Sequence, residues 1–143
     1  YLMGRPDLRG SYGLNYGIFF QNTVERDGQN MLGPGHWINW HVKHASRVPV
    51  FFDCTECTAC PSTWLAPPEH EGAFTADAMH TVCINRHQGG INMVFIDGGV
   101  RKVGLKELWT LKWTRDVNGN PWTRAGGVQP EDWPEWMRKF KDY

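Results

Sequence analysis

The chain lacks an excess of charge of either sign. Its 143 residues include 15 basic and 15 acidic side chains, so the formal net charge is zero. Binding to the phosphate backbone of a nucleic acid depends on many Lys and Arg contacts, and a neutral chain with no polybasic stretch does not fit that requirement. We therefore expect no nucleic-acid partner.

Long apolar runs and aliphatic residues are also scarce. The longest uninterrupted apolar run is Met93-Val94-Phe95-Ile96, whereas a membrane-spanning helix needs roughly 20 such residues. Leu, Ile, Val and Phe together make up only about 21% of the chain, which is just above the composition of disordered chains. The chain begins at Tyr1 without a signal segment, so we expect a processed product or a fragment.

Tryptophan compensates for the missing aliphatic residues. The chain has eight Trp, and each can bury roughly 150–250 Å² of surface. It also has 16 Gly and 9 Pro residues, which favour turns and loops. We therefore expect residues 1–143 to form a single, loop-rich domain with an aromatic core and a Trp-rich C-terminal region over residues 109–143.

The clearest local pattern is a β-hairpin over about 91–103. Two apolar segments flank Asp97-Gly98, and an Asp-Gly pair supplies the positive φ angles of a tight type I′ turn. The run at 48–53 is typical of a strand, and the partial alternation at 36–42 suggests another. Residues 12–20 fit either an irregular strand or a short helix.

Two short helices are expected in the last third of the chain. The spacing of the apolar residues at 105, 108, 109 and 111 predicts a helix over about 105–112. The segment at about 130–140 has acidic residues first and basic residues last, which matches the helix dipole. The predicted fold class is α+β, with a small antiparallel sheet, short helices and long loops.

Four cysteines are the strongest candidates for cross-linking or metal binding, and three of them lie close together in a long loop over 54–83. They are Cys54, Cys57, Cys60 and Cys83. In an oxidising compartment they would form two disulfides, with three pairings that the sequence does not rank. In a reducing compartment they could bind zinc together with His70, His80 or His87, although the spacing matches standard zinc modules poorly. We favour disulfides over zinc, with free thiols as a third alternative.

A weak calcium motif lies between two tryptophans. Asp116, Asn118 and Asn120 match the first three oxygen positions of an EF-hand loop. Pro121 stands where that loop needs Gly, and Gly127 where it needs Glu. A turn at Asn118-Gly119 explains the same residues, so no cofactor is required. The sequence has no nucleophile elbow, phosphate-binding glycine loop or H-E-x-x-H motif.

A more specific pattern spans residues 86–100. His87 is followed by nine residues and then by Asp97-Gly98. This string resembles the prepilin-type processing-associated domain, defined by an H-x9-DG signature, of type II secretion and type IV pilin-like proteins. The segments at 9–15 and 48–53, Pro67-Pro68 and the Trp-rich tail extend the resemblance over most of the chain.

The resemblance implies an exported, non-enzymatic subunit with a pseudopilin-like head. Its partners would be copies of itself and the pilus or secretion machinery, and its location would be extracellular, periplasmic or on the cell surface. Members of that family carry an apolar N-terminal helix that inserts into the membrane. This helix is absent from the present sequence, so we expect only the head, with membrane contact through the absent helix alone.

We interpret the H-x9-DG signature as structural rather than catalytic. Asp97 lies ten positions after His87, so in an extended strand they lie roughly 20–30 Å apart and cannot form one acid–base pair. Gly89 and Gly90 let the backbone bend into the first strand, and Gly98 serves the turn. We expect His87 to fix a neighbouring loop through hydrogen bonds.

Aromatic residues beyond those needed for the core would form contacts between subunits, because Trp is enriched at interfaces. The candidates are Trp133 and Trp136. An alternative function is an extracellular carbohydrate-binding module, in which Trp37, Trp40 and Trp64 would supply an aromatic platform. A Cys/His zinc-binding domain is the third alternative.

Overall fold

The structure is a computed structural model that describes residues 12–19, 23–26, 29–32, 37, 41–71, 78–115 and 120–143. Its strands are β1 (Tyr12–Asn15), β2 (Thr23–Arg26), β3 (Gln29–Leu32), β4 (Pro49–Asp53), β5 (Thr58–Ala59), β6 (Gly90–Phe95) and β7 (Val100–Gly104). Its α-helices are α1 (Tyr16–Phe19), α2 (Ala78–Val82) and α3 (Glu135–Arg138). Four 3-10 turns complete it: η1 (Ala45–Arg47), η2 (Lys106–Thr110), η3 (Arg124–Gly126) and η4 (Pro130–Asp132). The predicted α+β class is confirmed.

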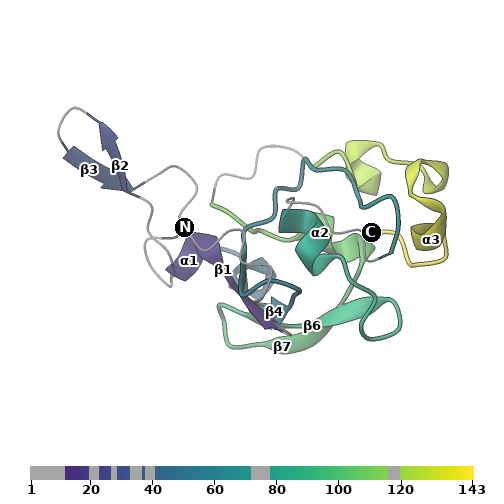
Figure 1. Ribbon diagram of the computed structural model, residues 1–143, viewed down its shortest axis with the longest axis horizontal. Coiled ribbons are helices and arrows are strands. Elements are labelled where there is room, and N and C mark those ends of the chain that lie inside the picture. The colour runs from purple at the N-terminus through teal and green to yellow at the C-terminus, as the bar shows by residue number, and fades with distance from the viewer. Residues whose placement is uncertain are drawn as a thin grey trace.

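The main sheet has five strands in the order β5-β1-β4-β6-β7, while β2 and β3 form a separate two-stranded ribbon. In Figure 1 the ribbon stands apart from the sheet, α2 lies above the sheet, and α3 lies at the opposite side of the molecule from the ribbon. The sheet is mixed, which corrects the antiparallel prediction: β5 runs parallel to β1. The chain bends after β4 and returns on the far side of β1, where the Leu14 amide donates to the Cys57 carbonyl over 3.0 Å.

The predicted hairpin is confirmed as β6 and β7, but its turn type is corrected. Val94 pairs with Val100, and the amide of Phe95 donates to the Gly99 carbonyl over 2.8 Å. Within the described turn over 95–99, only Gly98 has a positive φ, at 82°. A type I′ turn needs two such residues, whereas a three-residue loop that ends in a left-handed Gly needs one. The loop is therefore Ile96-Asp97-Gly98.

Both predicted helices are shorter than expected. The segment at 105–112 is the single 3-10 turn η2. The segment at 130–140 is divided into η4 and α3, because Trp133 is extended with a ψ of 143°. Trp133 precedes Pro134, and a residue before proline is driven away from helical angles by the proline ring.

The expectations for residues 12–20 and 36–42 have different outcomes. Residues 12–20 contain both alternatives, since β1 is followed at once by α1. Most of the strand expected at 36–42 lies outside the described residues, and His41 and Val42 are not in a strand. Among the described residues, no helix has the length and apolar character needed to cross a membrane.

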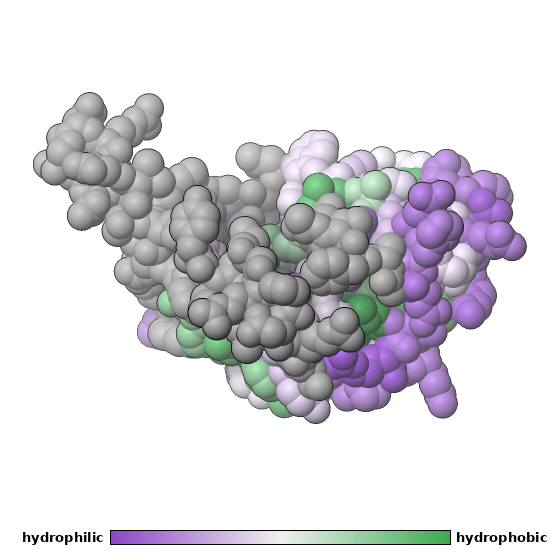
Figure 2. Space-filling view, in the orientation of Figure 1, coloured by the Kyte–Doolittle hydropathy of each residue, from purple (hydrophilic) through white to green (hydrophobic). Residues whose placement is uncertain are grey.

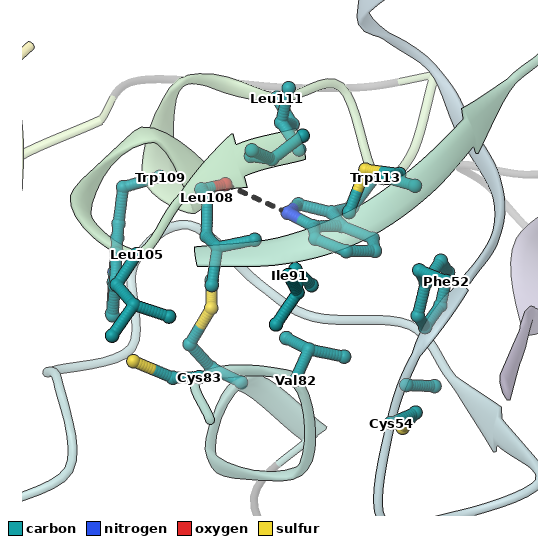
Figure 3. Packing of buried hydrophobic residues seen from close by; sticks show 14 of the residues in the cluster. Phe52, Cys54, Val82, Cys83, Ile91, Leu105, Leu108, Trp109, Leu111 and Trp113 are labelled. Atoms are coloured by element: carbon teal, nitrogen blue, oxygen red, sulfur yellow. Dashed lines mark hydrogen bonds between the residues drawn. The ribbon is translucent and has the colours of Figure 1, made fainter. Parts of the chain in front are cut away.

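The core is built on one face of the sheet and is strongly aromatic, as expected. Phe52 and Ile91 come from the sheet, Val82 from α2, and Trp109 and Trp113 from the region after β7 (Figure 3). The ring of Trp113 meets that of Phe52 edge-on at 5.1 Å. Its indole nitrogen donates to the Leu108 carbonyl over 2.9 Å, so its polar atom is satisfied within the apolar core.

Candidate functional site

The signature histidine is anchored to a buried carboxylate at the end of β4. Asp53 is only 2% exposed, and the Nε2 atom of His87 lies 3.0 Å from its Oδ2 atom. The same oxygen accepts the Asn92 amide over 2.7 Å, and the other carboxylate oxygen lies 3.5 Å from a guanidinium nitrogen of Arg86. A buried carboxylate is stable only with such partners. His87 thus fixes the loop that precedes β6.

The two glycines after His87 permit close packing that a side chain would prevent. Gly89 has a φ of 87°, and a Cβ atom on it would lie 3.0 Å from the Phe140 ring. A Cβ atom on Gly90 would lie 2.4 Å from the Val103 carbonyl oxygen. The amide of Leu105 donates to the Gly89 carbonyl over 3.0 Å. These contacts join the signature loop to β7 and to the C-terminal tail.

The other end of the signature has a local role. The Oδ1 atom of Asp97 accepts the Gly99 amide over 2.9 Å at the exposed tip of the hairpin. The structure therefore brings His87 together with Asp53 rather than with Asp97. Sequence analysis missed Asp53, although an acidic residue that ends an apolar strand is a recognisable signal, because buried acids need partners.

The four cysteines are free thiols in the structure. The thiol of Cys54 donates to Thr81 Oγ1 over 3.5 Å, and its sulfur accepts the Glu56 amide over 3.4 Å. Burial raises the pKa of Cys54, of Cys60 and, most strongly, of Cys83. These three thiols are therefore held in the neutral form, which is a poor nucleophile.

The arrangement counts against one of the three disulfide pairings. Figure 3 shows Cys54 and Cys83 at opposite ends of the core cluster. Cys57 and Cys60 flank the extended strand β5, so their Cα atoms are roughly 10 Å apart, whereas a bridge needs less than about 7 Å. The pairing 54–83 with 57–60 thus requires backbone movement. Disulfide formation itself stays a prediction.

The metal alternatives are also left as predictions. Within the part of the chain that the structure describes, no group of three or more His, Cys, Asp or Glu residues is arranged to hold a metal ion. Of the calcium motif, Asp116 and Asn118 lie outside the described residues. The carbonyl of Asn120 accepts the Thr123 hydroxyl over 3.1 Å, as in a turn.

The structure corrects one of the two predicted assembly contacts. Trp133 is 2% exposed. Its ring packs edge-on against Trp109 at 5.3 Å and, in a tilted arrangement, against Trp122 at 5.4 Å. A buried ring cannot contact a second copy, so Trp133 is a core residue. Trp136 is half-buried, and its indole nitrogen donates to the Pro68 carbonyl over 2.9 Å.

The tryptophans proposed for a carbohydrate platform differ in exposure. Trp64 is 60% exposed, while Trp37 is half-buried and Trp40 lies outside the described residues. One exposed Trp does not form a platform by itself. The carbohydrate alternative therefore stays a prediction that depends on Trp64.

The face of the sheet opposite the core carries a feature that sequence analysis missed. Strand pairing places Leu14 beside Phe51, Phe51 beside Val94, and Val94 beside Val100. We call these four residues the outer-face row. Phe51 and Val100 are exposed, and the Phe51 ring stacks on that of Tyr12 at 5.4 Å. Hydrophobic atoms are visible along the lower edge of the molecule, in the region of the sheet (Figure 2).

Comparisons with known proteins identify no similar protein. No family model matches the chain, and no curated protein or solved structure is significantly similar to it.

Proposed function

We propose that the chain is the globular head of an exported, non-enzymatic structural subunit of the pilin or pseudopilin type, and that it self-associates. The observation that carries this proposal is the outer-face row together with Tyr12. The proposed location is outside the cytoplasm, and the proposed partners are copies of the chain and the secretion or pilus machinery.

The outer-face row is costly to leave in water. Val100 is 70% exposed and Tyr12 is 56% exposed, and each square ångström of apolar surface that becomes buried contributes about 25 cal/mol. The row crosses four neighbouring strands and has no charged member. Contiguous exposed apolar surface of this kind is typical of interaction sites.

A second copy of the chain fits this surface. The row is apolar and lies on a sheet face, so two copies can bury the same residues against each other in a symmetric contact. The formal net charge is zero, so copies do not repel one another strongly. We therefore commit to self-association rather than to a charged partner.

A structural role also agrees with the contacts of the signature. Both carboxylate oxygens of Asp53 are engaged, by His87 and Asn92 on one side and by Arg86 on the other. A carboxylate held in this way orients a loop rather than abstracting a proton. These contacts support a non-enzymatic function.

The experiment compares a row variant with a matched control. Phe51→Ser with Val100→Ser removes the exposed centre and edge of the row, and Trp64→Ser removes an exposed aromatic side chain that lies outside the sheet. Sedimentation velocity over a range of concentrations measures assembly, and thermal unfolding reports the fold. We expect the parent protein and the control to associate and the row variant to remain a folded monomer.

Two outcomes contradict the proposal. One is a parent protein that stays monomeric at the highest soluble concentration. The other is a row variant that associates as strongly as the parent. A fluorescence titration with oligosaccharides tests the alternative. If the parent protein binds them and Trp64→Ser does not, the result favours a carbohydrate-binding module over a self-associating subunit.

A further inference from the structure

A hollow of about 340 Å³ lies where the signature loop, β7 and the C-terminal tail meet. Gln88 and Gly89 line it from the loop, Lys102 from β7, and Phe140 and Tyr143 from the tail. The volume lies within the range of sites for small ligands. None of these residues belongs to the outer-face row.

The charge around this hollow is unbalanced. Among the residues that the structure describes, three lysines line it, Lys102, Lys139 and Lys141, and no Asp or Glu side chain does. Within the described residues, none of the three is paired with a carboxylate. The acids nearby are already engaged, because Asp142 lies 2.6 Å from the Nζ atom of Lys106 and Glu107 lies 2.7 Å from a guanidinium nitrogen of Arg101.

The ammonium groups are held near the rim by weak contacts. The Nζ atom of Lys139 lies 5.3 Å from the Phe140 ring centre, and that of Lys141 lies 4.9 Å from the Tyr143 ring centre. The Nζ atom of Lys102 donates to the Gln88 carbonyl over 3.0 Å. Lysine is a flexible point charge with three donors, so Lys139 and Lys141 can turn toward an anion and leave the aromatic rings free to contact its apolar part.

The backbone beneath the lysines is fixed. Gln88 has a φ of 51° and Gly89 a φ of 87°, and a left-handed non-glycine residue is held in place only when its surroundings impose it. The His87–Asp53 contact and the hydrogen bond from the Gly89 amide to Asn85 Oδ1, 2.6 Å long, impose it here. The signature loop thus provides a rigid floor for the hollow.

From these observations we infer that the hollow binds a small organic anion, with its oxyanion group between Lys139 and Lys141 and its apolar body against the rings of Phe140 and Tyr143. The shared chemistry is a phosphate or carboxylate attached to a flat apolar group. Lysine pairs with either oxyanion as a point charge, so the two sources are separated by experiment.

The test titrates the protein with phenyl phosphate, phenylacetate, inorganic phosphate and phenol, and follows backbone amide NMR shifts. We expect saturable shifts of the Gly89, Gly104 and Leu105 amide signals with phenyl phosphate or with phenylacetate. Inorganic phosphate should bind more weakly, and phenol should not saturate. Comparison of phenyl phosphate with phenylacetate identifies the preferred oxyanion.

Two double variants with equal loss of charge test the lysines. Lys139→Gln with Lys141→Gln should weaken binding about fivefold or more, since two solvent-exposed ion pairs contribute modest energies. Lys43→Gln with Lys112→Gln removes two lysines outside the hollow and should change binding less than twofold. Equal losses in the two doubles, phenol binding as tight as that of the anions, or no saturable shift at these amides would each overturn the inference.

Discussion

The Nε2 atom of His87 lies 3.0 Å from the Oδ2 atom of Asp53, and this contact joins the loop before β6 to the end of β4. Asp53 is almost fully buried while the His87 side chain is 41% exposed. The pair is therefore asymmetric. Loss of the histidine leaves a buried acceptor short of one donor, whereas loss of the carboxylate removes the centre of the whole contact set.

This asymmetry predicts the order of effects of two substitutions. His87→Ala should lower the free energy of unfolding by about 1.5–3 kcal/mol, the usual range for a hydrogen bond to a charged group. Asp53→Ala should cost more, because the Asn92 amide and the Arg86 guanidinium also lose their acceptor. Chemical unfolding with guanidinium measures both values.

The control for this prediction is His70→Ala, since His70 is an exposed histidine outside the signature. It should change stability by less than about 0.5 kcal/mol, as surface substitutions usually do. A His87→Ala protein as stable as His70→Ala would show that the contact with Asp53 contributes nothing to the fold.

Local patterns were sufficient to predict the hairpin and the class of fold. The Asp97-Gly98 pair located the turn, because a left-handed residue is needed there and glycine adopts that conformation at low cost. The exact turn differed because pairing of Phe95 with Gly99 places only Gly98 in the left-handed region. The strand over 48–53 was found for a similar reason, as a short apolar run between polar segments.

Long-range partners could not be predicted in this way. The parallel pairing of β5 with β1 depends on the path of the chain after β4, and a two-residue strand has no periodicity to detect. The outer-face row exists only through the register of four strands. Trp133 was wrongly assigned to the assembly surface for the same reason. The rings that bury it, Trp109 and Trp122, are distant from it in the sequence. The sequence alone does not distinguish a buried tryptophan from an exposed one among these three.

The burial of Trp133 gives the second prediction. Trp133→Ala should destabilise the fold by about 3–5 kcal/mol, the usual cost of deleting a large core side chain. Trp136→Ala should cost clearly less, because its ring is half-buried at the side of the core. Thermal unfolding followed by near-ultraviolet circular dichroism reports both the stability and the packing of the rings.

The comparison includes Trp133→Phe, which keeps an apolar ring near the ammonium of Lys106, 5.0 Å from the present ring centre. This variant should recover part of the lost stability. A folded Trp133→Ala protein with parent stability and reduced self-association would return Trp133 to the assembly surface.

The third prediction concerns alkaline pH and the thiol of Cys83. Burial raises the pKa of this thiol well above its ordinary value of 9.0, and the carboxylate of Glu71 acts in the same direction. In the unfolded chain the thiol loses its proton near pH 9, while in the folded chain it keeps the proton to higher pH. The unfolded state then binds fewer protons than the folded state, so stability falls as the pH rises.

The expected slope of the unfolding free energy against pH corresponds to the release of one proton on unfolding. Under reducing conditions, unfolding free energies measured between pH 7 and pH 10.5 should be nearly constant at first. Above about pH 9, Cys83 alone should remove about 1.4 kcal/mol for each pH unit. The raised thiol pKa values of Cys54 and Cys60 and the raised pKa of Tyr143 add to the fall in the same direction. The contribution of Cys83 is therefore the difference in slope between the parent protein and Cys83→Ala.

A matched variant separates titration from packing. Val82→Ala removes apolar volume from the adjacent, fully buried position without removing an ionisable group. It should lower stability at every pH and keep the parent slope, whereas Cys83→Ala should lower stability at neutral pH and flatten the slope above pH 9. Parallel curves for the parent and Cys83→Ala would contradict the prediction, because they would mean that titration of the Cys83 thiol contributes nothing to the loss of stability at alkaline pH.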